Sequence, residues 1–445
     1  MDVLIVGGSI AGSTLAMFLS KSDLSIAIVD KNPREKIGEK ICGNGISASY
    51  FDKLGIPKPT KNEIYSVIRS AKIISPNFKD QILVKGEGYT IDRLKLNQRF
   101  LKIAEENGVE IIDRTNVLEP IIRDNRVSGV VARKGKEIIK IHSKVVVDAS
   151  GVTGVIRNKL RKYLVESSAE PFDLIIACRD VIKFKHQLDG SLEIYLGHKF
   201  SPGGYAWIFP EGEEMLNIGL GVQPVSGFTK NPKDLLERFK RIKGLSNAEI
   251  LKTGCWPVPV RRPLAQLVYE GFLVLGDAAF QANPLHGGGM GNAMVAAKIA
   301  LDVLLEAEKF TINELWRYAY EYMRGGGAKN AALEVPKLLL QGFKDKDFEW
   351  LISKSGITSE EVASLEFSLR RKGSIWKKLI LNAIVRKPLL LRRFKKARDL
   401  YREILSHYKN YPEKYNKKAL KRWYNIAESL ILKARKYLWR NPYKI

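Results

Sequence analysis

A glycine-rich segment near the N-terminus is the first place where residue types and spacing point to chemistry. Gly7-Gly8-Ser9-Ile10-Ala11-Gly12 follows a short apolar run, and Asp30 comes eighteen residues after Gly12. Gly7 permits a tight turn, Gly12 lets a helix approach a strand, and the free N–H groups at the helix start can bind a pyrophosphate. Ser9 replaces the central glycine of this fingerprint. The segment predicts a dinucleotide site rather than an ordinary glycine-rich turn, and the charge of Asp30 favours an unphosphorylated ribose.

A second acidic segment indicates which dinucleotide this is. Gly276-Asp277 ends the apolar run that starts at Phe272, and the glycines 287–289 then lead into another helical pattern. The first motif suits NAD and FAD equally. A distant acid for a ribityl chain and a second helix N-terminus for a flavin ring suit the longer cofactor, so the two segments together favour FAD.

Three aromatic residues could shape a substrate pocket. Tyr205, Trp207 and Phe209 alternate along one expected strand and therefore share a face. They could wall an apolar slot and stabilise a developing cation, although an aromatic stripe is also typical of sheet core. Tyr205 is a possible proton source, but a phenol with a pKa of about 10 donates poorly without help.

The cysteines and histidines give weaker signals. Cys42 lies in the glycine-rich run Lys40–Gly45, where a proton donor, a substrate-gating contact, a redox-sensitive switch or a small packed residue are all open. Cys178 and Cys255 are expected to be packed core residues, and a bridge between them stays open. His286 could lie near a flavin or cap a helix, so we assign it no catalytic role. The histidines show no spacing that predicts a metal site.

The elements that position these residues follow from the pattern. A strand at 2–6, a helix at 13–21 and a strand at 25–30 form a βαβ opening. Short alternating strands fill about 160–262, and helical patterns take over from about 331. With 445 residues, we expect two or three domains. We assign residues 1–72, 93–160 and 263–330 to a discontinuous FAD-binding domain, 73–92 and 161–262 to a substrate and catalytic β-sheet domain, and 331–445 to a basic helical C-terminal domain.

Several of these motifs resemble those of known flavoproteins. The opening glycine motif, Asp92-Arg93, Val147–Gly151 and Gly276-Asp277 are similar to the p-hydroxybenzoate hydroxylase superfamily. Within it, the run 202–210 matches the PxxYxWxFP signature of geranylgeranyl reductases, and Lys40–Gly45 resembles their Cys-Gly loop on the flavin. The resemblance covers roughly residues 1–330. It implies an α/β (α+β) fold: a Rossmann-like FAD-binding domain with an inserted antiparallel β-sheet substrate domain and a helical C-terminal region.

The resemblance also implies a function and a set of residues. The family hydrogenates isoprenoid C=C bonds with FAD, in archaea those of geranylgeranyl chains on membrane ether lipids. Its cofactor positions, together with the opening motif, map to Gly7, Ser9, Ala11, Gly12, Asp30, Cys42, Gly43, Arg99, Val117, Asp277, Gly289 and Met290. Tyr205, Trp207 and Phe209 map to the substrate pocket. The catalytic group stays open among Cys42, Tyr205 and Trp207, and no metal is implied.

The sequence also allows other functions for the chain. The chain could reduce another prenyl substrate, such as a quinone tail or geranylgeranyl diphosphate, or act as a flavin monooxygenase or halogenase. A flavoprotein that binds at the membrane surface without catalysis is a further alternative. The electron donor is undecided between NADPH and a ferredoxin, because no second dinucleotide motif is visible.

The charge is concentrated at one end of the chain. The net charge is +26, and residues 370–445 contribute 24 Lys and Arg against four acids. Basic segments with interleaved apolar residues, such as 389–405 and 419–439, favour contact with an anionic membrane surface, with Leu390, Phe394 and Trp423 among the candidate interface residues. A solvated helical domain is the alternative, and no motif indicates specific nucleic-acid binding. We see no signal peptide or spanning segment and expect a cytoplasmic, peripherally membrane-associated protein.

Arg261-Arg262-Pro263 is a further basic motif. It follows a proline-rich stretch and leads back into the expected FAD-binding part. Two adjacent arginines of this kind could bind a lipid phosphate or pair with carboxylates of the protein. The sequence leaves both uses open.

Overall fold

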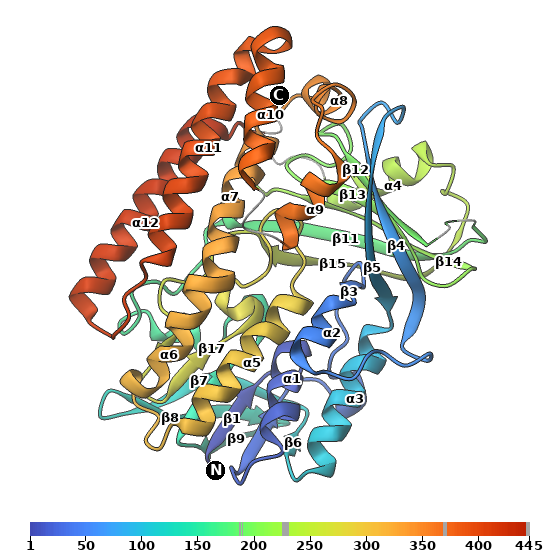
Figure 1. The fold of residues 1–445 in the computed structure, drawn as a ribbon. Coiled ribbons are helices and arrows are strands. Elements are labelled where there is room, and N and C mark those ends of the chain that lie inside the picture. Colours follow the sequence, from blue (N-terminus) through green and yellow to red (C-terminus); the bar gives the residue numbers. More distant parts are fainter. Residues whose placement is uncertain (187, 189, 225–230, 368–371, 442–445) are drawn as a thin grey trace.

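The described part of the chain forms three sheets and a large helical layer (Figure 1). The computed structural model describes residues 1–186, 188, 190–224, 231–367 and 372–441. Five short helical turns connect the main elements: Arg34–Lys36, Gly151–Thr153, Arg157–Leu160, Pro171–Asp173 and Gly276–Ala279. The predicted α/β fold class is confirmed.

The N-terminal strand lies inside a six-stranded sheet. Its order is β16 (Val268–Tyr269), β17 (Phe272–Val274), β10 (Val145–Asp148), β1 (Val3–Val6), β2 (Ile26–Val29) and β6 (Glu110–Ile112), parallel except at β16. Every residue of β1, β2 and β10 is buried, as expected for parallel strands that are covered on both faces. The sheet therefore forms a rigid base for the loops at its carboxyl edge.

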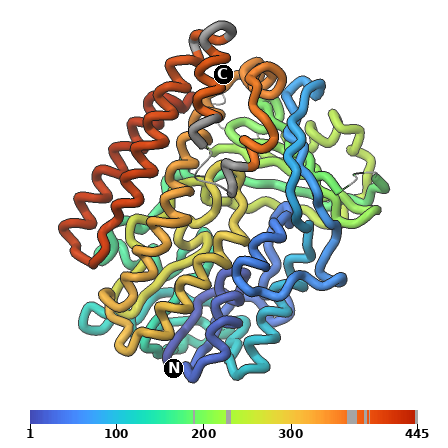
Figure 2. Tube along the Cα trace, viewed as in Figure 1, coloured from blue at the N-terminus to red at the C-terminus, as the bar shows by residue number. Residues whose placement is uncertain are grey.

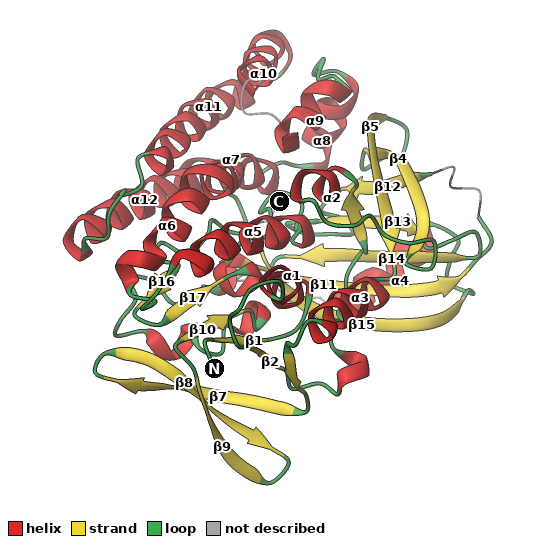
Figure 3. Cartoon of the chain, turned by 60° about the horizontal axis from the view of Figure 1, so that its bottom comes forward, coloured by secondary structure: helices red, strands yellow, loops and turns green. Residues whose placement is uncertain are grey.

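Helices and a small sheet cover this base. On one side, α1 (Ile10–Leu19) packs between α3 (Arg93–Glu106) and α5 (Met290–Glu306). A three-stranded sheet of β7 (Thr115–Arg123), β8 (Arg126–Lys134) and β9 (Glu137–His142) lies next to β10, as Figure 3 shows. The helix predicted at 13–21 is present as α1, with its boundaries shifted by two to three residues.

The second large sheet has eight strands. In order they are β15 (Glu249–Pro259), β11 (Leu174–Lys183), β14 (Met215–Val222), β13 (Tyr205–Pro210), β12 (Ser191–Leu196), β4 (Ile64–Ile74), β5 (Gln81–Ile91) and β3 (Gly45–Ser47). Only the β12–β4 pair is parallel. The predicted boundary placed residues 64–72 in the FAD-binding part of the chain. Because β4 begins at Ile64, these residues instead belong to the eight-stranded sheet.

One face of the eight-stranded sheet is a conventional core. The amphipathic helix α4 (Pro232–Ile242) covers it, and Leu235, Leu236 and Phe239 pack on Ile218 and Leu220 of β14. A short helix α2 (Ser49–Leu54) follows β3. The opposite face of the sheet looks towards the glycine-rich loops of the six-stranded sheet.

Helices fill the C-terminal part, as predicted. After α6 (Ile312–Tyr322), a π-helical turn at Met323–Gly327 leads into α7 (Ala328–Gln341), α8 (Asp345–Ser353), α9 (Ser359–Phe367), α10 (Lys372–Arg386), α11 (Pro388–Lys409) and α12 (Lys417–Leu438). Figure 2 shows α11 and α12 side by side along one flank, where both pack on α7. No helix in the described ranges carries an apolar stretch long enough to cross a bilayer.

The apolar stripes of α11 and α12 face the protein. Leu390 and Phe394 of α11 and Trp423 of α12 are buried in the main core. Their use as membrane-interface residues was wrong, because protein covers them: Phe394 packs on Phe343 and Trp350, and Trp423 packs on aromatic rings of α11 and of the residue Tyr411 after it. Tyr437, within the basic segment 419–439, is exposed.

Candidate cofactor and substrate site

One cavity of about 940 Å³ joins the two large sheets. Its walls come from the glycine-rich loops at the carboxyl ends of β1 and β17 and from the face of the eight-stranded sheet opposite α4. A polar region around Ser9 and Asp30 is thereby continuous with an apolar region around Trp207 and Val258.

The turn after β1 has the geometry that a dinucleotide motif requires. Gly7 has φ +100°, and a Cβ on Gly12 would lie 1.9 Å from the carbonyl oxygen of Gly7. Asp30, at the end of β2, accepts hydrogen bonds from the backbone N–H of Gly8 (2.9 Å) and Asn32 (2.9 Å). The carboxylate thus fixes the loop and also lines the cavity.

Two helices point their N-termini into this region. Ser9 is the N-cap of α1 and Gly289 that of α5, and neither helix has a side-chain cap or an acidic residue in its first turn. Ser9 Oγ instead accepts a hydrogen bond from Arg93 Nη2 at 3.1 Å. Uncapped N–H groups and a positive helix end suit an anionic ligand.

Asp277 is the acid of the second segment. Burial alone would raise the pKa of its carboxyl, but the ion pair with Lys40 and the charge of Arg93 outweigh it and lower the pKa. Asp277 is therefore ionised at neutral pH. Its position beside Gly289, the N-cap of α5, places a hydrogen-bond acceptor in the cavity wall.

Most predicted cofactor residues meet at this cavity. The ones that line it are Gly7, Ser9, Ala11, Asp30, Cys42, Gly43, Val117, Asp277, Gly289 and Met290. Gly12 lies behind them in α1. Arg99 does not line the cavity and pairs with Glu63 at 2.7 Å, whereas Arg93, six residues earlier on α3, does line it.

The aromatic row forms the sheet wall of the cavity. Tyr205, Trp207 and Phe209 of β13 all line it, while the alternate residues Ala206 and Ile208 pack in the core under α4. Trp207 is only 7% exposed, and a Cβ built on Gly219 of β14 would lie 2.2 Å from its Cζ2 atom. The indole therefore lies flat over the neighbouring strand.

A polar network that the sequence analysis missed holds this wall and the Cys42 loop together. Asn217 of β14 accepts from Trp207 Nε1 (2.9 Å) and donates to the carbonyl of Cys42 (2.9 Å) and to Glu211 (2.7 Å). Glu211 also accepts from Asn44 at 2.8 Å. Asn217 lies in the GxG-containing strand after the aromatic row, but nothing in its local pattern marks it.

Cys42 and Tyr205 lie on the two sides of the apolar region. Cys42 Sγ accepts from the backbone N–H of Asn44 at 3.3 Å, and the cysteine is not in a disulfide. Tyr205 donates its hydroxyl proton to the carbonyl of His286 at 2.6 Å. Burial, together with the nearby Cys42, raises the pKa of Tyr205 well above its usual value, so the phenol holds its proton tightly.

Cys178 and Cys255 form the bridge that the sequence left open. The disulfide joins β11 and β15, where the two residues are direct neighbours in the antiparallel register. Cys178 is also buried in the core under α4, with Cys255 packed against it, as expected for packed core residues. Strand register brings these residues together although they are 77 positions apart in the sequence.

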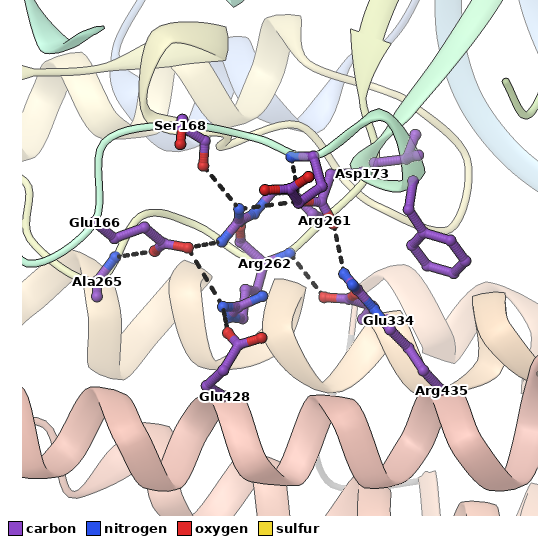
Figure 4. Close-up of polar contacts among 12 residues, drawn as sticks. Glu166, Ser168, Asp173, Arg261, Arg262, Ala265, Glu334, Glu428 and Arg435 are labelled. Atoms are coloured by element: carbon purple, nitrogen blue, oxygen red, sulfur yellow. Dashed lines mark hydrogen bonds and ion pairs between the residues drawn. The ribbon is translucent and has the colours of Figure 1, made fainter. Parts of the chain in front are cut away.

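Arg261 and Arg262 pair with carboxylates of the protein. Figure 4 shows Glu166 accepting from both guanidinium groups, with Asp173 on Arg261 (3.1 Å) and Glu428 of α12 on Arg262. Arg435 of α12 reaches Asp173 at 2.6 Å. Of the two uses left open by the sequence, the structure favours the carboxylate pairing, and it ties α12 to the loop before β16.

The residues around the polar region fit FAD. They supply two uncapped helix N-termini for phosphate and ring oxygens, two carboxyl groups for hydroxyl groups, and close glycine packing where the backbone must approach a ligand. A nicotinamide dinucleotide would leave the Asp277 half without a partner.

Comparisons with known proteins agree with this geometry. Residues 2–158 match the family model of FAD-dependent oxidoreductases, and residues 173–255 match that of the geranylgeranyl reductase catalytic domain. The second match spans β11 to most of β15, which includes the aromatic row and Asn217.

Curated relatives extend the match to the whole chain. A digeranylgeranylglycerophospholipid reductase of Sulfolobus acidocaldarius is 34% identical over 98% of both chains. A second such reductase, from Methanothermobacter thermautotrophicus, is 33% identical over 69% of this chain and 78% of its own.

Solved structures share the fold. A geranylgeranyl bacteriochlorophyll reductase-like protein from Thermoplasma acidophilum superposes with a TM-score of 0.76 at 23% identity, over 89% of this chain and 98% of its own. A flavin-dependent brominase gives a TM-score of 0.63 at 15% identity, over 97% and 99%.

Proposed function

Since the chain belongs to the geranylgeranyl reductase family, we propose that it reduces the C=C bonds of geranylgeranyl chains on glycerol phospholipids inside the cavity described above. It is an FAD-dependent enzyme of the oxidoreductase class. The observation that carries the proposal is the continuity of the cavity: one space runs from the dinucleotide loops to the aromatic wall of β13.

The chemistry divides between cofactor and protein. Reduced FAD supplies a hydride when it is bound. The protein holds the alkene against the cavity wall, and Ile175, Val258 and Leu285 keep the surroundings apolar. The faces of Trp207 and Phe209 stabilise positive charge at the more substituted alkene carbon, a contribution of up to about 2 kcal/mol per ring in a desolvated site.

A proton must reach the other alkene carbon. Tyr205 is a poor source, since its pKa is raised and its proton is donated to the carbonyl of His286. We propose Cys42 as the proton-bearing group of this wall, because its loop is held in place by Asn217 and its side chain borders the cavity. Tyr205 then serves to position the His286 loop.

Anaerobic turnover tests the reaction class. Dithionite-reduced protein mixed with digeranylgeranylglyceryl phospholipid should yield products whose masses rise in steps of two hydrogens. A requirement for O2 would instead indicate an oxygenase or halogenase, and the proposed reduction would be wrong.

Trp207→Ala tests the aromatic wall. We expect the rate of alkene reduction to fall by about tenfold or more, as expected from the loss of one cation-stabilising ring of up to about 2 kcal/mol. The flavin absorbance of the purified protein should stay at the wild-type level. The matched control is Trp350→Ala, a buried tryptophan of α8 outside the cavity. Wild-type turnover in the Trp207 variant would remove this side chain from the substrate site.

The basic surface of α12 supports a second part of the proposal, a contact with anionic membranes. Lys418, Lys421, Arg422 and Lys436 are exposed there together with the apolar residues Ile426 and Leu432. Cations near an anionic bilayer contribute about 1 kcal/mol each, and scattered apolar side chains add to this. The substrate is a membrane lipid, so such a contact would bring the enzyme to it.

Vesicle sedimentation tests this contact. Replacing Lys418, Lys421 and Lys436 by Gln should reduce binding to anionic vesicles, with little change for neutral ones. The control replaces Lys134, Lys136 and Lys140 of the three-stranded sheet, which are equally exposed. Equal losses in both triple variants would mean that the attraction comes only from the overall net charge.

NADPH and a ferredoxin are the two candidate electron donors. Stopped-flow measurement of flavin reduction by each of them distinguishes the two.

A further inference from the structure

Arg179 of β11 is a buried cation that the reaction does not use. It is 8% exposed, and its Nε and Nη1 atoms are buried without a hydrogen-bond partner. In the described part of the chain, no carboxylate pairs with these two buried guanidinium atoms. A desolvated charge without a partner is costly, so such a group is expected where a ligand supplies the missing acceptors.

Strand alternation places Arg179 on the cavity side of the sheet. Ile175, Ala177 and Arg179 line the cavity, whereas Cys178 and Ile182 pack in the core under α4. The direct neighbours of Arg179 in the register are Gly219 on β14 and Gly254 on β15. Because neither neighbour has a side chain, the space beside the guanidinium is left to Trp207, which lies over Gly219, and to Ile41, which lies over Gly254.

Three other cations that line the cavity and are at least partly buried already have partners. Lys40 pairs with Asp277, and Lys337 Nζ donates to the carbonyl of Val260 at 2.6 Å. Arg93 donates to Ser9 beside the N-terminus of α1. Each of these therefore belongs to the cofactor region or to the protein's own structure, and Arg179 differs from all three.

The position of Arg179 relates it to the opening of the cavity. Lys252 and Thr253 line the cavity and belong to the exposed half of β15, directly before Gly254. Further along β15, Trp256 and Val258 are partly buried and form the apolar wall. A ligand with an anionic end at Arg179 and Lys252 would thus extend its apolar part inwards along the aromatic row.

We propose that Arg179 is an anchor for the phosphate of the prenyl substrate. This inference rests on the proposed function and adds the group by which the substrate is held. A guanidinium forms paired hydrogen bonds to phosphate oxygens, and the apolar wall accepts an isoprenoid chain attached to that phosphate. Two substrates carry this chemistry: a phosphate in a glycerolipid headgroup and the diphosphate of a free prenyl diphosphate.

Steady-state kinetics with matched substrates test the anchor. Arg179→Gln, Arg179→Lys and the control Arg238→Gln, an exposed arginine on α4, are compared on three compounds. These are digeranylgeranylglyceryl phosphate, its neutral alcohol counterpart and geranylgeranyl diphosphate. For the natural anion, Arg179→Gln should raise KM by about tenfold or more with little change in kcat, because a charged hydrogen bond is lost from uniform binding.

The three compounds separate the sources of the phosphate. A KM effect on the glycerol phosphate alone identifies a headgroup, and an effect on the diphosphate alone identifies a prenyl diphosphate. Arg179→Lys should recover part of the affinity, and the neutral lipid should bind every variant equally. Equal losses on neutral and phosphorylated lipids, or no loss on either, would overturn the proposal.

A binding measurement separates this inference from the reaction itself. Quenching of tryptophan fluorescence by each compound, with inorganic pyrophosphate as competitor, needs no turnover. Pyrophosphate should compete in the wild type and Arg238→Gln, and about tenfold more weakly in Arg179→Gln. If the wild type binds the phosphorylated lipid but reduces none of the compounds, the proposed function fails while the anchor stands. If pyrophosphate competes equally in all variants, the anchor fails whatever the activity.

Discussion

Two sets of buried arginines, Arg261 with Arg262 and Arg179 alone, are treated in opposite ways by this fold. Arg261 and Arg262 are surrounded by carboxylates from three separate segments, Glu166, Asp173 and Glu428. Arg179 is similarly buried but faces a cavity and no described carboxylate. The first group joins α12 to the body of the protein (Figure 4). The second has a charge that the fold leaves unpaired.

This difference separates charges that hold the fold from charges that serve a ligand. A buried ion pair contributes little net stability, yet losing one partner is strongly destabilising, because the other charge stays buried. Arg261 and Arg262 are thus committed to the structure. Removing the charge of Arg179 should cost no stability, since no partner is left behind. Variants of the two groups should therefore respond differently.

Glu166→Gln should give the largest effect on stability. Glu166 accepts from Arg261, Arg262 and the backbone N–H of Ala265, so its neutralisation leaves two guanidinium groups with one carboxylate fewer. We expect a loss of about 3 kcal/mol in the free energy of unfolding, measured by denaturant titration. Glu403→Gln, which breaks the exposed Lys433–Glu403 pair, is the control and should cost less than about 1 kcal/mol. Similar losses in both would contradict the division into two groups.

Acid should weaken the same network by a smaller amount. Burial raises the pKa of Asp173 and of Glu334, but nearby cations outweigh it and hold both pKa values below their usual range. These cations are Arg261, Arg435 and Lys337 for Asp173, and Lys337, Arg262 and Arg435 for Glu334. A lowered folded-state pKa gives stability that is present above the unfolded pKa and is lost as the pH falls through the folded one. At about pH 4 the loss is partial, because these carboxyls are still largely ionised in the folded chain.

Thermal unfolding of the wild type and Asp173→Asn measures this dependence. The midpoint of the wild type should fall between about pH 5 and pH 3 more steeply than that of the variant, which lacks one of the titrating groups. Parallel curves would mean that Asp173 does not contribute to the pH dependence.

Gly219→Ala perturbs the cavity wall without touching the charged network. A Cβ at this position would lie 2.2 Å from Trp207 Cζ2 and 2.7 Å from the Cys178 carbonyl, so the indole or the strand must move. We expect alkene reduction to fall by about tenfold to a hundredfold, as expected for misplacement of a positioning group. Gly86→Ala on β5 is the control, because a Cβ there meets nothing within 4 Å. Unchanged turnover in Gly219→Ala would show that the indole position does not matter.

The division between what the sequence predicted and what it missed follows the range of the interactions. The turn at Gly7 and Gly12, the helix after it and the alternation of Tyr205 with Trp207 depend on neighbours a few residues away. Asn217 and the Cys178–Cys255 disulfide depend on how distant strands align, which no local pattern records. Trp423 shows a third limit: an amphipathic pattern reveals an apolar face but not whether protein or lipid covers it.

Arg93 illustrates the same limit within one helix. The resemblance to known reductases pointed to Arg99, yet it is Arg93 that lines the cavity beside Ser9, while Arg99 pairs with Glu63. Both lie on α3, and only the docking of the helix beside the glycine-rich turn decides which one faces the cavity.

Arg179→Gln should have the smallest effect on stability, and it tests most directly whether Arg179 differs from the arginines that are paired with carboxylates. The substitution removes a buried charge that has no described counter-ion. The free energy of unfolding of the ligand-free protein should therefore stay within about 0.5 kcal/mol of the wild-type value or rise. Phosphorylated prenyl lipid should raise the midpoint of the wild type more than that of the variant, since a ligand stabilises only the state that binds it. A ligand-free loss of about 3 kcal/mol, similar to that of Glu166→Gln, would place Arg179 in the structural group instead.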